Sequence, residues 1–190
     1  MRHPIAPVPR FDRGLPRGFT LLEALVVLAL LGILVSLAAP AVSDLRARHQ
    51  VQAQAEGFLG SLVLARTEAL RRQQRVSLCA QAGHSTCDAS GRWQQGWLVF
   101  VDANDNGLRE DGETLIEVHP ALPPAVRLDS ASTAKAYFSY GAEGRSTSIT
   151  GAFMAATWRF CRTSLPEGWQ VVSNALGKPR IEKYTPPDCP

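Results

Sequence analysis

An uncharged run of twenty residues near the N-terminus, residues 24–43, constrains this chain most. A helix of that length can cross the hydrocarbon layer of a bilayer. Four arginines precede the run and favour a cytoplasmic N-terminus with the rest of the chain outside the cytoplasm: Arg2, Arg10, Arg13 and Arg17. The alternative is a secretory signal peptide cut at the far end of the run, where Ala39 and Ala41 mimic a small-x-small cleavage site.

The net charge of the 190-residue chain is +3, but the excess of basic residues lies in the first 18 residues. The first 18 residues hold four arginines and Asp12, so the remainder has 20 − 4 = 16 basic and 17 − 1 = 16 acidic residues. Residues 19–190 are therefore neutral. Bulk charge gives no case for nucleic-acid binding, and any such case has to be local.

Six residues at the start of the apolar run, Gly18-Phe19-Thr20-Leu21-Leu22-Glu23, carry a resemblance to a known family. They resemble the cleavage and assembly motif of type IV prepilins and type II secretion pseudopilins. The resemblance implies that residues 1–18 are a leader. It also implies that a prepilin peptidase of the inner membrane cuts between Gly18 and Phe19 and methylates the new amine. It further implies that other pilins of a filament are partners.

Glu23 is the assembly residue that this resemblance implies, with the Phe19 amine of a neighbouring subunit as its partner. A carboxylate at the start of a membrane segment is costly and usually has a partner, which agrees with that role. The alternative is an interfacial glutamate that the helix dipole favours and that touches nothing. Replacement of Glu23 separates the two interpretations.

The residues after the apolar run predict that the helix continues to about residue 75. Apolar residues recur at steps of three and four, with one turn skipped, and form one stripe: Val51, Ala55, Phe58, Leu62 and Ala69. We therefore expect an N-terminal helix over residues 19–75, with a transmembrane half at residues 19–43. The stripe is expected to pack against the folded domain that follows.

Short apolar segments separated by turn residues predict strands in the rest of the chain. The expected strands are residues 75–80, 96–101, 114–119, 126–128, 136–140, 157–162, 169–173 and 180–184. A long helix followed by short strands indicates an α+β fold with a mostly antiparallel sheet. We expect residues 76–190 to form one periplasmic β domain with a C-terminal tail. The four tryptophans lie in or beside these strands and fit a sheet core.

The segment Trp93-Gln94-Gln95-Gly96-Trp97-Leu98-Val99-Phe100-Val101-Asp102, with the acidic turn after it, resembles the GspH/FimT group of minor pilins. The turn also matches a calcium-loop signature, D-x-[DN]-x-[DN]-G-x5-E, through Asp102, Asn104, Asn106, Gly107 and Glu113. Strands rather than helices are expected beside it, and Arg109 occupies a position that is usually apolar. The alternative is a hairpin whose Asp and Asn side chains bond their own backbone.

Four cysteines, Cys79, Cys87, Cys161 and Cys189, lie beyond the apolar run, which agrees with an oxidising periplasm. Three pairings are possible, and we favour Cys79 with Cys87 and Cys161 with Cys189. The second bond would hold the C-terminal tail on the domain. A zinc site is the rival, but the sequence has no C-x2-C pair.

A basic turn near the C-terminus gives the sharpest functional indication. In FimT-type minor pilins of transformable bacteria, a Gly-Arg-x-Arg motif here is associated with DNA binding. Gly177-Lys178-Pro179-Arg180 resembles it, with lysine in place of the first arginine. Lysine keeps the charge but loses the bidentate fork. With Lys183 nearby, the turn would contact phosphates of double-stranded DNA without reading sequence. A solvated turn with ordinary surface charges is the alternative.

Two functions therefore stay open from the sequence. One is a FimT-like minor pilin of the inner membrane, exposed outside the cell once in a pilus, that binds DNA for natural transformation. The other is a structural minor pilin, or a GspH-like pseudopilin of type II secretion, without DNA binding. No catalytic motif is present in the sequence, so an enzyme is not expected, and no cofactor is predicted.

Overall fold

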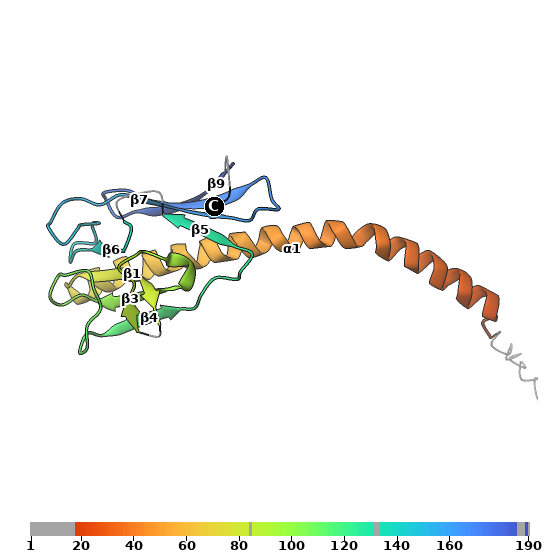
Figure 1. Ribbon diagram of the computed structural model, residues 1–190, viewed down its shortest axis with the longest axis horizontal. Coiled ribbons are helices and arrows are strands. Elements are labelled where there is room, and N and C mark those ends of the chain that lie inside the picture. The colour runs from red at the N-terminus through yellow and green to blue at the C-terminus, as the bar shows by residue number, and fades with distance from the viewer. Residues whose placement is uncertain (1–17, 84, 131–133, 186–188, 190) are drawn as a thin grey trace, which may run out of the picture. The chain divides into compact units, whose positions relative to one another are not determined.

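The computed structural model describes the chain except residues 1–17, 84, 131–133, 186–188 and 190, and it leaves out the side chains of residues 37–41 (Figure 1). The described residues form two compact units, which divide between Val42 and Ser43. The predicted leader lies outside the described residues, apart from Gly18.

One helix, α1 (Leu21–Arg72), contributes to both units. It starts after Thr20, whose hydroxyl oxygen accepts a hydrogen bond of 3.2 Å from the Glu23 backbone N–H. This is the usual N-cap interaction of a threonine, and it satisfies one amide of the first turn. The helix ends where Gln73 takes a left-handed conformation with φ of 54°.

The last turn of α1 carries an ion-pair cluster. Arg71 and Arg72 both donate to the Glu68 carboxylate, each at 2.6 Å. Hydrogen bonds from Arg71 and then Arg72 lower the pKa of Glu68 to about 2. Cations at a helix C-terminus also interact favourably with the helix dipole, so these arginines stabilise the end of the helix.

Residues 21–36 of α1, in the first unit, are all exposed in the single chain. Among the residues that the structure describes, no helix is long and apolar enough to cross a membrane. The predicted transmembrane half, residues 19–43, falls partly on residues 37–41, whose side chains lie outside the description.

The second unit contains nine strands and one short helical turn in its described residues. The first group is β1 (Val76–Ala82), β2 (Thr86–Cys87), η1 (Trp93–Gln95), β3 (Trp97–Val101) and β4 (Leu115–His119). The second is β5 (Arg127–Ser130), β6 (Tyr137–Tyr140), β7 (Ala156–Cys161), β8 (Gly168–Ser173) and β9 (Pro179–Tyr184). The eight predicted strands are confirmed, with ends shifted by at most two residues. The two-residue β2 and the η1 turn were not predicted.

The strands form two antiparallel sheets (Figure 1). In the first sheet, β1 pairs with β3 on one side and β6 on the other, β3 pairs with β4, and β2 pairs with the end of β1. In the second sheet the order is β5-β7-β8-β9. The predicted α+β class is confirmed, but the division into two sheets was not predicted from the sequence.

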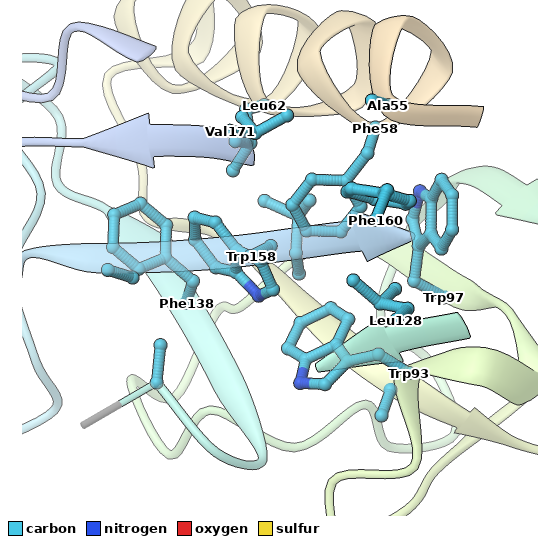
Figure 2. Close-up of a cluster of buried hydrophobic side chains, with 14 of the residues drawn as sticks. Ala55, Phe58, Leu62, Trp93, Trp97, Leu128, Phe138, Trp158, Phe160 and Val171 are labelled. Atoms are coloured by element: carbon cyan, nitrogen blue, oxygen red, sulfur yellow. The ribbon is translucent and has the colours of Figure 1, made fainter. Parts of the chain in front are cut away.

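The part of α1 within the second unit packs against both sheets through the predicted apolar stripe. All five stripe residues are buried, and Ala65 fills the turn that the sequence pattern skipped. Phe58 lies at the centre (Figure 2), and its ring centroid is 4.8 Å from those of both Trp97 and Trp158. Such aromatic pairs contribute about 0.5–1.5 kcal/mol beyond the area they bury. The helix therefore forms part of the core of this unit.

Two disulfides hold segments outside the main core. Cys79 of β1 bonds to Cys87 of β2, eight residues later, and Cys161 of β7 bonds to Cys189, 28 residues later. These are the pairings that we favoured from the sequence. The second bond joins the residue that precedes the C-terminal Pro190 to the end of a central strand of the second sheet.

Candidate functional site

The N-terminal motif lies at the exposed end of the first unit. Phe19 is 84% exposed, and Gly18 and Glu23 are exposed as well. Glu23 occupies the first turn of α1, three residues after Thr20, in the spacing of a capping box. The Thr-x-x-Glu spacing is visible in the sequence and indicates a helix N-terminus at Thr20, in addition to the assembly and helix-dipole interpretations of Glu23.

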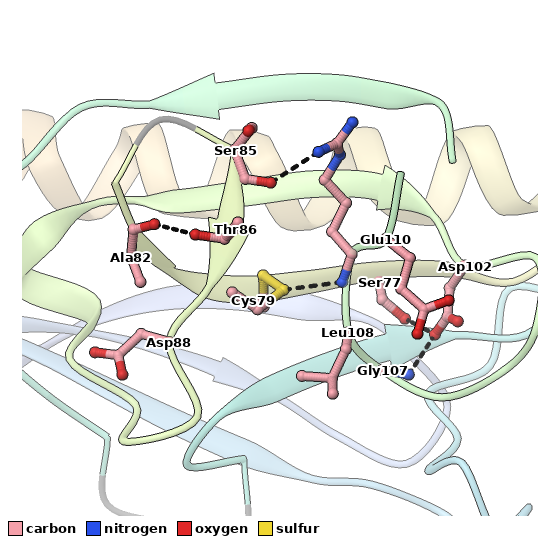
Figure 3. Close-up of a disulfide and its surroundings, with 12 residues drawn as sticks. Ser77, Cys79, Ala82, Ser85, Thr86, Asp88, Asp102, Gly107, Leu108 and Glu110 are labelled. Atoms are coloured by element: carbon pink, nitrogen blue, oxygen red, sulfur yellow. Dashed lines mark hydrogen bonds between the residues drawn. A yellow bond between two sulfur atoms is a disulfide. The ribbon is translucent and has the colours of Figure 1, made fainter. Parts of the chain in front are cut away.

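The acidic turn after β3 closes on itself through Asp102. This carboxylate is buried, accepts a hydrogen bond of 2.6 Å from the Ser77 hydroxyl, and accepts another of 3.0 Å from the Gly107 backbone N–H (Figure 3). Its second oxygen accepts the Asn106 backbone N–H at 3.0 Å. Asp102 therefore ties the turn to β1 and satisfies two backbone amides of the turn.

The other calcium-loop positions are also engaged within the turn. Glu113 accepts backbone N–H groups from Ala103 and Glu110, each at 2.9 Å. The amides of Asn104 and Asn106 donate to the Glu110 carboxylate at 2.8 and 3.0 Å. This geometry is that of the self-bonded hairpin, which was the alternative interpretation. In the part of the chain that the structure describes, no group of three His, Cys, Asp or Glu side chains is placed to hold a metal ion.

Arg109 fixes the same turn to the first disulfide, which gives a reason for an arginine at this position. Its backbone N–H lies 3.2 Å from the Cys87 sulfur, and its guanidinium donates to the Ser85 carbonyl at 2.9 Å. On the other side of the turn, the Arg75 guanidinium contacts Asp105 at 2.6 Å. The turn is therefore held at both sides, by Arg109 within it and by Arg75 outside it.

The basic turn connects β8 to β9, and its backbone is tightly fixed. Gly177 has φ of +72°, in the left-handed region, and its N–H donates to the Asn174 carbonyl at 2.9 Å. The Asn174 side-chain oxygen accepts the Lys178 backbone N–H at 3.2 Å. Glycine is required here for a second reason, since a methyl group at position 177 would lie 2.4 Å from the Gly144 carbonyl oxygen.

The four predicted DNA-contact residues do not form one patch. Residues 180 and 183 are three apart on β9, so their side chains leave opposite faces of the strand. The Lys183 ammonium lies 3.8 Å from the Glu167 carboxylate and 5.6 Å from the Trp169 ring centroid. The structure thus keeps Gly177, Lys178 and Arg180 together at the turn and places Lys183 across the strand.

Arg180 shares its face of β9 with Glu182 and is paired with it. The Arg180 Nε atom lies 3.2 Å from the Glu182 carboxylate, which also accepts a hydrogen bond of 2.7 Å from Gln170 on β8. These two hydrogen bonds, that of Gln170 first, lower the pKa of Glu182, so this carboxylate stays negative. The period-two alternation of a strand could have predicted this pair from the sequence.

Sequence reasoning did not connect Arg145 with the basic turn. Arg145 is exposed, lies 32 residues before Gly177, and is flanked by two residues that contact the turn, Gly144 and Ser146. Its guanidinium carbon lies 5.5 Å from the centroid of the exposed Phe153 ring. No local sequence pattern could have predicted a proximity that depends on the packing of two distant loops.

Comparisons with known proteins agree with this architecture. The family model described as "Type II transport protein GspH" matches residues 54–177, and that of the "Prokaryotic N-terminal methylation motif" matches residues 16–39. The pilin-like protein PilA1 of Thermus thermophilus is 36% identical over 103 residues, which are 54% of this chain. The match spans 59% of the length of PilA1.

Solved structures of low sequence identity share the fold. The type IV minor pilin FimU of Pseudomonas aeruginosa has a TM-score of 0.55 at 17% identity, over 75% of this chain and 97% of FimU. The minor pseudopilin EpsH of the Vibrio cholerae type 2 secretion system has a TM-score of 0.50 at 14% identity, over 73% of this chain and 99% of EpsH. Since the GspH model covers well over half of the residues and the fold agrees, this chain belongs to the GspH family of type IV pilin-like proteins.

Proposed function

We propose that this chain is a minor type IV pilin, which the N-terminal part of α1 holds in the inner membrane until the subunit enters a pilus. The observation that carries this proposal is the exposed apolar surface of that part of the helix. Leu21 is 82% exposed, Leu22 is 72% exposed, and every described side chain up to residue 36 is exposed. A continuous apolar surface of this kind needs lipid or protein to cover it.

The match to the N-terminal methylation motif supports a processing step at the same end. In this proposal a prepilin peptidase cuts between Gly18 and Phe19, and the folded domain lies in the periplasm, with its disulfides formed in that oxidising compartment. Glu23 then meets the Phe19 amine of the next subunit. Its exposure in the single chain leaves its carboxylate open to such a partner.

Replacement of Glu23 tests the assembly role. We expect Glu23→Ala to remain in the membrane fraction and to disappear from sheared pili, because insertion needs only the apolar run whereas assembly needs the carboxylate. Glu56→Ala is the matched control, since Glu56 is an exposed glutamate of the same helix within the second unit. Normal recovery of Glu23→Ala in pili would contradict the assembly role.

We further propose that the turn between β8 and β9 binds extracellular double-stranded DNA for uptake in natural transformation. Lys178 and Arg180 are both exposed at this turn. The turn backbone is held by Asn174 and Gly177, so the cations project from a fixed support. Contacts of this kind are made to phosphates and carry no sequence preference.

The DNA proposal is tested on the full chain purified in a nonionic detergent. We expect it to bind two duplexes of unrelated sequence equally, with an affinity that falls as salt rises. The double variant Lys178→Ala/Arg180→Ala should bind at least about threefold more weakly. Absence of binding by the unmodified chain at low salt would overturn the DNA proposal and leave the assembly proposal standing.

A structural role without DNA binding is the second candidate, in a pilus or in a type II secretion pseudopilus. It is favoured by the pairing of Arg180 with Glu182 and of Lys183 with Glu167, which leaves fewer unpaired cations near the turn. Secretion and transformation assays of a deletion strain distinguish the two. Loss of secretion with normal DNA uptake would support the second candidate.

A further inference from the structure

We infer that Arg145 and Lys178 together form the phosphate-binding pair of this domain, with Arg180 and Lys183 contributing little. This inference rests on the proposed DNA binding and names which side chains make the contacts. It joins the turn between β8 and β9 to a distant loop, residues 141–153, that carries no DNA-binding motif in the sequence.

The two segments are locked together by backbone contacts. A methyl group at Gly177 would lie 2.4 Å from the Gly144 carbonyl oxygen and 3.2 Å from the Ser146 backbone nitrogen. The Ser146 hydroxyl donates to the Asn174 carbonyl at 2.8 Å and lies 2.7 Å from the Met154 carbonyl. Both chain neighbours of Arg145 therefore touch the turn that presents Lys178.

The loop itself is anchored to α1, so the position of Arg145 is fixed relative to the domain. The Arg66 guanidinium donates to the Gly144 carbonyl at 3.0 Å, and a methyl group at Gly144 would lie 2.9 Å from the Leu70 side chain. Ser146 is buried while Arg145 is exposed, so the arginine points to solvent. Its guanidinium lies over the Phe153 ring, a cation–π contact that restricts its rotamers and does not neutralise its positive charge.

The salt bridges of the basic residues distinguish those that are free to bind a phosphate from those that are already paired. Among the described residues, no carboxylate forms a salt bridge with Arg145 or Lys178. Arg180 is paired with Glu182, and a phosphate that approached it would meet that carboxylate too. Lys183 is paired with Glu167 on the other face of β9. Arg145 and Lys178, which are exposed whereas Arg66 is half-buried, are thus the pair beside the turn that gains most from a phosphate.

The occupant that fits this surface is the backbone of a duplex. Two exposed cations on separate loops, held at fixed positions, match a ligand whose charges repeat along a line. The arginine provides a planar fork for phosphate oxygens, which the lysine lacks. Glu143, exposed two residues before Arg145, is the acidic side chain nearest in sequence and should oppose binding.

Four single variants of the full chain in nonionic detergent test the inference by equilibrium DNA binding at several salt concentrations. We expect Arg145→Ala and Lys178→Ala each to weaken binding about three- to tenfold and to reduce the slope of log K against log salt by about 1. Arg180→Ala should change affinity less than twofold. Arg46→Ala is the charge-matched control, since Arg46 is exposed and lies 24 residues, or about 36 Å along α1, before the Leu70 that contacts this loop.

Two further variants guard against indirect effects. Arg145→Lys keeps the charge and should retain the salt slope, whereas a slope reduced as much as in Arg145→Ala would contradict a phosphate contact made through this charge. Glu143→Gln should strengthen binding. Normal binding by Arg145→Ala with severe loss in Arg180→Ala would overturn this inference alone. No binding by the unmodified chain would instead overturn the DNA proposal on which it rests.

Discussion

At the scale of single residues, a few polar side chains hold the loops of the second unit. Asp102, Glu113 and Asn174 each accept backbone N–H groups of the turn in which they lie. Asp88 has the same role beside the first disulfide, where it accepts the Ser90 hydroxyl at 2.6 Å and Arg92 at 2.7 Å. Removing one such acceptor leaves a donor without its partner. Where that donor is buried, the free energy lost is larger than the net contribution of a single hydrogen bond to stability.

Asp88→Asn should lower the free energy of unfolding at pH 7 by about 1 kcal/mol. The Ser90 hydroxyl and then Arg92 depress the pKa of the Asp88 carboxyl well below its usual range. A depressed pKa stabilises the fold above the unfolded-state pKa of about 3.9, and this contribution is lost as pH falls through the lower folded-state pKa. Urea unfolding followed by tryptophan fluorescence should therefore show a difference from the unmodified chain that shrinks below about pH 4.

Asp111→Asn is the control for that experiment, because Asp111 is an exposed carboxylate of the acidic turn. Its replacement should leave stability and its pH dependence nearly unchanged, as surface substitutions usually do. A constant difference between Asp88→Asn and the unmodified chain from pH 7 to pH 2 would contradict the assignment.

Gly177→Ala compared with Gly83→Ala separates backbone strain from packing. Both glycines have nearly the same left-handed φ, +72° and +73°, but a methyl group at Gly83 meets nothing within 4 Å. Strain alone costs about 1–2 kcal/mol at either position. We expect Gly177→Ala to destabilise more, because its methyl group would displace the Gly144 carbonyl. Equal losses in urea unfolding would show that the two loops separate easily.

At the scale of elements, periodicity in the sequence was sufficient for the helix and the longer strands. The stripe from Val51 to Ala69 follows the helical period and is buried throughout. The turn residues between the strands predicted the positions of eight of the nine described strands. The two-residue β2 was missed because such a segment has no alternation to read, and η1 because a single turn has no period.

The candidate DNA-binding site could be predicted from the sequence less completely than the helix and the strands. Lys178 and Arg180 lie in one turn, so a local motif could indicate them. The contact between residues 144–146 and the turn depends on packing between loops and leaves no local signal. The alternation of side chains along a strand predicts that Lys183 and Arg180 lie on opposite faces of β9. The basic motif by itself does not contain this information.

Phe58→Ala should be among the most destabilising substitutions on α1. Its ring contacts those of Trp93, Trp97, Trp158 and Phe160, and it is fully buried. Truncation of a buried phenylalanine costs about 3–5 kcal/mol. Val63→Ala, on the same helix but 49% exposed, should cost less than about 1 kcal/mol. Urea unfolding reports both, and similar costs would contradict the packing described.

At the scale of the whole molecule, the second unit combines one helix, two sheets and two disulfides. The helix and both sheets share the main hydrophobic cluster, and a smaller cluster of Cys79, Leu98 and Phe100 lies within the first sheet. The disulfides act at the margins, on the β1–β2 hairpin and on the C-terminal tail. This arrangement agrees with the GspH family match over residues 54–177, which includes the C-terminal part of α1, the first sheet, and β5, β7 and β8 of the second sheet.

Removal of the two disulfides should have unequal effects. In the chain-entropy model, closing the 28-residue separation of Cys161 and Cys189 stabilises by about 3.5 kcal/mol, against about 2.5 kcal/mol for the eight-residue separation of Cys79 and Cys87. Paired alanine variants avoid burying a new hydroxyl. Thermal unfolding should show the larger loss of Tm for Cys161→Ala/Cys189→Ala. The reverse order would indicate that strain or residual structure outweighs loop closure.

The position of Phe58 also determines when this domain can fold. Its partners Trp158 and Phe160 are 100 and 102 residues later in the chain, so the helix is synthesised long before the strands that cover it. Contacts of such high sequence separation incur loop-closure entropy before they stabilise anything, and folding is slow when they dominate. We therefore expect a millisecond-to-second folding step that begins only after β7 and β8 have been made. Until then the nascent chain has to keep this helix face from aggregating.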